Sequence, residues 1–102
     1  MAKSDGYKDY VTEKGRLVIL QVIGREFNGH LREDLIQKAL DAYFLSRSIE
    51  WVRTQLRKLE ELGAVQLTDD AGKMIAGITR TGRDHVDRRA PIDGVAWPED
   101  EA

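Results

Sequence analysis

The sequence contains no cysteine, which excludes disulfides, thiol catalysis and zinc sites built on thiolates. Histidine is also scarce. His30 and His85 lie far apart in the sequence, and neither has a second histidine or a carboxylate one helical turn away on a convincing helix face. We therefore expect no metal site and no cofactor. We also expect both histidines to be surface or boundary residues.

Long apolar runs are absent as well. The longest, Leu17 to Leu20, is far shorter than the roughly 20 residues that a membrane-spanning helix needs. Residues 1–10 are polar and lack the hydrophobic stretch of a signal peptide, so we expect a cytoplasmic protein without membrane contact. Because residues 1–9 also show no periodicity, they are interpreted as a flexible N-terminal arm.

The composition predicts a single folded domain. The chain has 102 residues, of which 41% are hydrophobic and 33% charged, and these values exclude a disordered chain. The net charge of -2 hides an uneven distribution: residues 1–89 hold 16 basic and 14 acidic side chains, and every later charge is acidic. Strong binding to nucleic acid would therefore require a local cluster of basic residues.

Apolar periodicity predicts three helices in the first part of the domain. The first runs from Tyr10 through Phe27 and ends at Asn28-Gly29, and the second spans about residues 31–43. Ser46 is expected to cap the third helix, and Gly63 to end it in a left-handed conformation. The apolar face of this third helix is formed by Ile49, Val52, Leu56, Leu59 and Leu62.

After Gly63 the period changes to alternation, which predicts a β-hairpin over residues 64–79 with a loop of four or five residues at Asp69–Lys73. Thr79 is expected to cap a short last helix that ends before Pro91. Residues 90–102 are interpreted as an extended acidic tail, in which Val95 and Trp97 are expected to dock on the domain or on a second chain. The domain proper is assigned to residues 10–89.

Local motifs sharpen this interpretation. "VRTQLRKLEELGAVQL" is followed by "ITRTGRDHV", so a Leu-Gly pair ends one helix and an Ile-Thr-x-x-Gly phrase follows the hairpin. This order resembles the winged helix-turn-helix proteins of the MarR and ArsR type. Residues 31–98 are further similar to a small winged-helix protein of Mu-like prophages. The implied fold is α+β and mostly helical, with a three-helix core, a two-stranded β-hairpin wing, a short C-terminal helix and an extended tail.

The resemblance implies binding of double-stranded DNA, with the third helix in the major groove and the wing beside the backbone. Arginine can pair with guanine edges, while lysine and hydroxyl side chains contact bases or phosphates. Residues 47–58 contain four basic side chains and one acidic one. The expected DNA-binding residues are Arg47, Ser48, Trp51, Thr54, Arg57 and Lys58 on the helix, Lys73 at the wing tip and Arg80 just behind it.

Two functions remain open. The first is a transcriptional regulator acting as a homodimer, since one winged helix contacts few base pairs; the first helix, the last helix or the tail would form the contact. The second is a winged-helix module that binds a phage protein. It is favoured by Asp69 and Asp70 in the wing turn, which would repel phosphates, and by Trp51, which is bulky for a groove. Because no catalytic motif is present, an enzyme is not expected.

Overall fold

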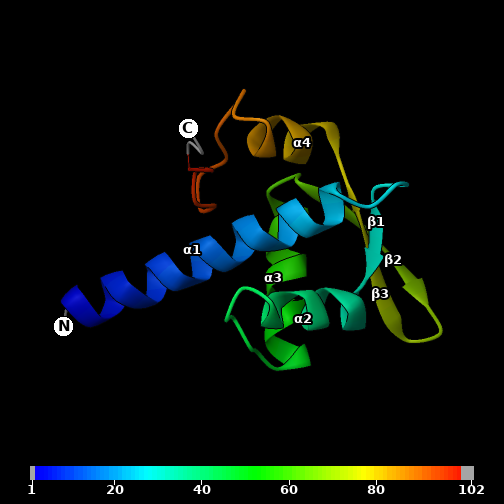
Figure 1. Cartoon of the computed structure of the whole chain (residues 1–102), viewed down its shortest axis with the longest axis horizontal. Helices are drawn as coiled ribbons and strands as arrows, with labels where there is room; N and C mark the ends of the chain where they lie inside the picture. Colours follow the sequence, from blue (N-terminus) through cyan, green and yellow to red (C-terminus); the bar gives the residue numbers. More distant parts are fainter. Residues whose placement is uncertain (1, 100–102) are drawn as a thin grey trace.

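The computed structural model describes residues 2–99, and its side chains from residue 6 onward. The fold is α+β, with helices over about half of the chain and a small antiparallel sheet, as the sequence predicted (Figure 1). In chain order the elements are α1 (Ala2–Gly24), β1 (His30–Arg32), α2 (Glu33–Asp41), α3 (Ile49–Glu61), β2 (Val65–Asp70), β3 (Lys73–Ile78) and α4 (Arg80–Val86).

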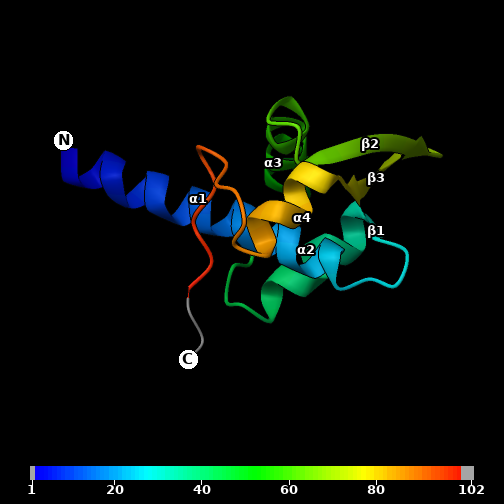
Figure 2. The same cartoon turned by 90° about the horizontal axis from the view of Figure 1, so that it is seen from above.

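Helix α1 is longer at its start than the sequence predicted. It begins at Ala2 rather than near Tyr10, so residues 2–9 are helical and not a loose arm. The apolar periodicity used for the prediction is missing there because the described side chains of residues 6–10 are all exposed. Figures 1 and 2 both show this half of α1 projecting from the rest of the molecule. The other end comes earlier than predicted, at Gly24, and leaves Phe27 fully exposed.

The sheet has three strands rather than the two of the expected hairpin. Residues 30–32 form the short strand β1, although the second helix was predicted to begin at about residue 31. β1 pairs with β3 in the order β1-β3-β2, and Leu31 lies opposite Ala76. Three residues are too few for alternation to be recognised, which explains why the sequence did not predict this strand. On the other edge of the sheet, the Leu67 N–H of β2 donates to the carboxylate of Glu60, at 3.0 Å.

The hairpin turn is tighter than predicted. Asp70 pairs directly with Lys73, so only Ala71 and Gly72 form the loop, and the prediction of four or five loop residues was wrong. Both loop residues have positive φ, 52° and 89°, as a two-residue turn of the primed type requires. Alanine is rarely found in this conformation, which costs it roughly 1–2 kcal/mol, and for this reason the sequence gave little sign of the turn.

The core lies between the second half of α1, the inner faces of α2 and α3, and one side of the sheet. The predicted apolar face of α3 is confirmed, since Val52, Leu56 and Leu59 are fully buried. Gly63 ends the helix with φ at 80°, also as predicted. The cap is Ser48 and not Ser46: its hydroxyl accepts from the Trp51 N–H at 3.1 Å. No helix among residues 2–99 is long and apolar enough to cross a membrane.

The segment after α4 belongs to the domain and is not a free tail. Ile92 and Val95 join the core with exposed fractions of 9% and 6%. The Ala96 N–H donates to the Glu13 carbonyl on α1 at 3.1 Å, and Arg16 donates to the Gly94 carbonyl at 2.7 Å. Val95 therefore docks on its own domain, one of the two partners expected for it. Residues 100–102, the acidic end of the predicted tail, lie outside the described residues.

His85 fixes this segment and is fully buried, so the expectation of a surface or boundary histidine was wrong. Its Nδ1 accepts from the Ile92 N–H at 2.9 Å, which places the ring proton on Nε2, and Nε2 donates to the Ala96 carbonyl at 2.8 Å. Trp97 meets the imidazole edge-on at 5.3 Å. A neutral histidine with both nitrogens bonded can be buried without an unsatisfied polar atom. His30, by contrast, is exposed.

Candidate nucleic-acid interface

The side of α3 opposite the core is exposed and carries both signs of charge. Thr54, Arg57 and Lys58 lie on this outward face, as the spacing from the buried Val52 and Leu56 requires. Lys58 lies 3.7 Å from the Glu61 carboxylate, and both side chains are largely in solvent, so this pair holds Lys58 only weakly. Among residues 6–99, no carboxylate forms a salt bridge with Arg57. Arg57 is therefore the cation on α3 most available to a ligand.

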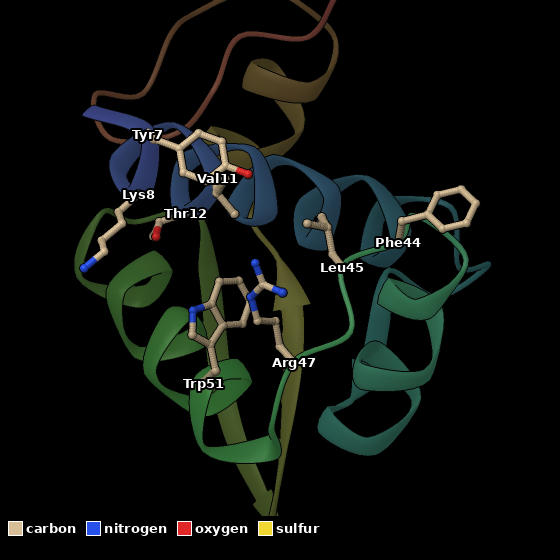
Figure 3. A pocket seen from close by; sticks show the side chains of 8 residues that line it. All are labelled: Tyr7, Lys8, Val11, Thr12, Phe44, Leu45, Arg47 and Trp51. Carbon is tan, nitrogen blue, oxygen red and sulfur yellow. The ribbon is translucent and has the colours of Figure 1, made fainter. Parts of the chain in front are cut away.

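Three other predicted residues do not belong to this face. Arg47 and Trp51 lie at the start of α3 and are turned toward α1 and the loop before α3 (Figure 3). The Trp51 ring packs on Gly15 of α1 so closely that a Cβ added there would come within 2.6 Å of it. The Arg47 guanidinium lies over the same ring at 5.5 Å. Since Ser48 is the helix cap, none of the three stands free as the sequence interpretation required.

Arg53 is also one of the four basic side chains counted in residues 47–58, and a buried carboxylate neutralises its charge. Its guanidinium binds the Glu33 carboxylate at 2.6 Å and again at 3.0 and 3.1 Å. Glu33 is only 1% exposed, and one of its oxygens also accepts from the Met74 N–H of β3 at 2.9 Å. The Arg53 hydrogen bonds, helped by the Met74 N–H, keep the pKa of Glu33 below its usual value although burial opposes this.

This junction fixes the geometry of the outward face. One carboxylate at the start of α2 holds α3 through Arg53 and the hairpin through Met74, so the three elements keep a fixed mutual orientation. The sequence contained no signal for it, because Glu33 and Arg53 are 20 positions apart and only the fold brings them together. The pairing also removes one of the positive charges counted in residues 47–58.

At the hairpin tip, Lys73 is exposed, as predicted, and the two neighbouring aspartates are engaged within the fold. An Asp69 oxygen accepts from the Gly72 N–H at 3.3 Å, and Asp70 lies 3.9 Å from the Arg32 guanidinium. Arg32 also binds Asp34 with two hydrogen bonds of 2.6 and 2.9 Å, which lowers the pKa of Asp34 to about 2. Each of the two aspartates at the tip therefore has a partner within the fold, the Gly72 N–H for Asp69 and the Arg32 guanidinium for Asp70.

Arg80 does not lie beside Lys73. It follows β3 at the end opposite the hairpin tip, because Lys73 begins that strand and Ile78 ends it (Figure 1). There Thr79 donates to the Gly63 carbonyl at 2.6 Å, which brings Arg80 close to the C-terminal end of α3. Its side chain is 87% exposed and pairs with Asp84 at 3.7 Å. The structure thus places Arg80 and Lys73 at opposite ends of the hairpin and does not bring them together.

The outward face of α3 presents two cations and a hydroxyl group, which are chemically suited to anions or polar partners. Residues 6–99 contain no group of three or more histidine or carboxylate side chains that could hold a metal ion. The surface hollows are open grooves. One of them, of about 380 Å³, lies between the first half of α1 and the loop before α3 and contains Tyr7, Leu45 and Trp51 (Figure 3).

Comparison with known proteins gave one informative result. No protein-family model and no solved structure matches the chain. The chain is 34% identical over 94 residues to gp26, an uncharacterized protein of Escherichia phage Mu, and the alignment covers 92% of this chain and 97% of gp26. The two chains are therefore similar over nearly their whole lengths. The chain belongs to the family of the phage Mu protein gp26.

Proposed function

We propose that the chain is a DNA-binding phage protein of the winged-helix type, in which α3 enters the major groove and the β2–β3 hairpin lies beside the backbone. The observation that carries this proposal is the outward face of α3, where Arg57 is exposed without a carboxylate partner among residues 6–99, next to Thr54 and Lys58. A guanidinium in this position is free to pair with a guanine edge or a phosphate.

The arrangement of the elements supports this proposal. A helix that reads a groove must stand clear of the body on one side, and α3 buries only its opposite side. The hairpin follows α3 directly, and the Glu33 junction holds both in one orientation. Relatedness to a phage protein is compatible with a role in controlling phage genes, which is the regulatory role proposed for this chain.

The proposed contacts are fewer than those predicted from the sequence. Arg57 and Thr54 are assigned to the groove, and Lys58 and Lys73 to phosphates on either side. Arg80 would reach only the backbone near the far end of the hairpin. Arg47, Ser48 and Trp51 are not included, because Trp51 packs on α1, Arg47 lies over the Trp51 ring and Ser48 caps the helix.

Titration of fluorescent random duplex DNA at several salt concentrations tests the proposal. Changing Arg57 and Lys58 to alanine removes two cations, so the slope of log K against log salt should fall by about 2 and binding should weaken at every salt concentration. The matched control is Lys38→Ala with Arg89→Ala, which removes the same charges from exposed positions outside α3 and the hairpin. Equal slopes for the two double variants would contradict the proposal.

A protein-binding module is the second candidate, favoured by the balanced charge of α3. Glu50 and Glu61 share the exposed surface of this helix with Arg57 and Lys58, and Arg53 is neutralised by Glu33. Such a face suits a polar protein surface better than a row of phosphates. Absence of any DNA binding at low salt, combined with capture of a phage protein that is lost on Arg57→Glu, would favour this candidate. Trp51→Ala is not a clean test, because it would also remove packing on α1.

A further inference from the structure

The first half of α1, residues 2–14, is here called the arm, and its projecting part presents apolar side chains to solvent. Tyr7 is 70% exposed and Tyr10 is 59% exposed. The groove beside the arm has polar as well as apolar walls and leads to the loop before α3, where Phe44 is 94% exposed. Figure 3 shows Tyr7 over one end of the groove and Phe44 at the other. A neighbouring aromatic, Tyr43, is 37% exposed.

Two features indicate that another molecule covers this surface in the functional state of the protein. Helices in proteins are stabilised mainly by the packing of one face, yet the first described side chains of the arm, residues 6–10, are all exposed. Phe44 has φ at 60°, a conformation that costs a bulky residue roughly 1–2 kcal/mol. This backbone holds the Phe44 ring at the end of the groove and outside the domain's own core (Figure 3).

We propose that a second copy of this chain covers the arm. The arm forms one wall of its own groove, so a two-fold axis beside it sets each arm against the groove of the other copy and covers both surfaces in one closed contact. The charges of the described part of the arm cancel, since Lys8 and Lys14 balance Asp9 and Glu13. Each arm therefore brings both signs of charge and no net charge to the groove of the other copy, which Arg47 lines together with apolar side chains. Binding of nucleic acid would instead require an excess of positive charge on the arm.

Sedimentation equilibrium of the full chain between about 1 and 200 µM tests this inference without DNA, so its outcome is independent of the proposed function. The wild type should sediment as a dimer. Tyr7→Asp and Phe44→Asp should each weaken the dimer at least about a hundredfold, because the two-fold axis makes each change count twice. Aspartate tolerates positive φ better than phenylalanine does, so the Phe44 variant should still fold.

The matched control is Phe27→Asp, which places the same charge on a fully exposed aromatic position in the turn after α1, away from the arm. Its dimer should match the wild type, and circular dichroism should show equal helix content in all variants. Because the chain has no cysteine, Tyr7→Cys and Val11→Cys also report proximity directly. A disulfide-linked dimer is expected from at least one of them under mild oxidation.

Three results would overturn the inference. The wild type could remain a monomer at the highest concentration. Its dimer could persist unchanged in Tyr7→Asp and Phe44→Asp, which would place the contact elsewhere. Phe27→Asp could dissociate it as strongly as the arm variants do, which would place the contact at the turn after α1.

Discussion

Replacing Glu33 by glutamine removes a negative charge from the junction of α2, α3 and β3 while nearly preserving the shape of the side chain. The glutamine oxygen can still accept from the Met74 N–H, but its amide group would face the donors of Arg53. Breaking a fully buried ion pair from one side costs about 3–5 kcal/mol. Since the Arg53 side chain is 35% exposed and can turn toward water, we expect a loss of about 2–3 kcal/mol, near or below the low end of that range.

Urea unfolding followed by circular dichroism measures this loss at pH 7, and thermal unfolding should show a Tm about 10 °C lower. The pKa of Glu33 is lowered in the folded state, so its contribution is fully present above the unfolded value of about 4.3 and is lost as the pH falls through the folded value. The difference between wild type and Glu33→Gln should therefore shrink below about pH 4.

Two further variants separate the ion pair from simple packing. Arg53→Met leaves the Glu33 carboxylate buried without its cation and should destabilise more than Glu33→Gln does. The double variant should be more stable than the sum of the two losses implies, because neither unpaired group remains. The reasoning would be refuted if Glu33→Gln changed the free energy of unfolding by less than about 0.5 kcal/mol at pH 7, or if the two single losses were additive.

The remaining predictions concern the packing of α1 and of the C-terminal segment. Gly15→Ala should destabilise by about 1–3 kcal/mol and shift the fluorescence of Trp51, because the new Cβ meets the indole; an unchanged spectrum would mean that the ring is free. His85→Ala removes the partners of the Ile92 N–H and the Ala96 carbonyl and leaves a cavity, so we expect a loss of about 2–4 kcal/mol. Hydrogen exchange at Ile92 should become fast in this variant, and retained protection would contradict the assigned role.

The fold was predictable wherever a local pattern is repeated over several turns. The buried Val52, Leu56 and Leu59 recur at helical spacing, and both Gly63 and Thr79 end or begin helices as expected. Short elements were not predictable, because they contain too few residues for a pattern to be repeated. Strand β1 offers three residues, and the hairpin turn contains an alanine in a conformation more typical of asparagine or glycine.

The candidate site was predictable only on the face of α3 that has no tertiary partner. Thr54, Arg57 and Lys58 are exposed because the helix period alone determines that they point away from the core. Trp51 and Arg53 flank that face, and each contacts a residue from a distant part of the chain. Trp51 packs on Gly15, and Arg53 forms an ion pair with Glu33. Such pairings depend on how elements pack, and no local spacing encodes them.

The segment bonded to His85 also bears on how the protein is made. Ile92 and Val95 complete the core, yet a ribosome synthesises them after all of α1 and α3. Before these residues are made, the side of α1 that the C-terminal segment contacts is exposed to solvent. A nascent chain that stopped before this point would expose that surface to chaperones and proteases. A premature stop codon even this late in the gene should therefore yield a misfolded product rather than a slightly shortened functional one.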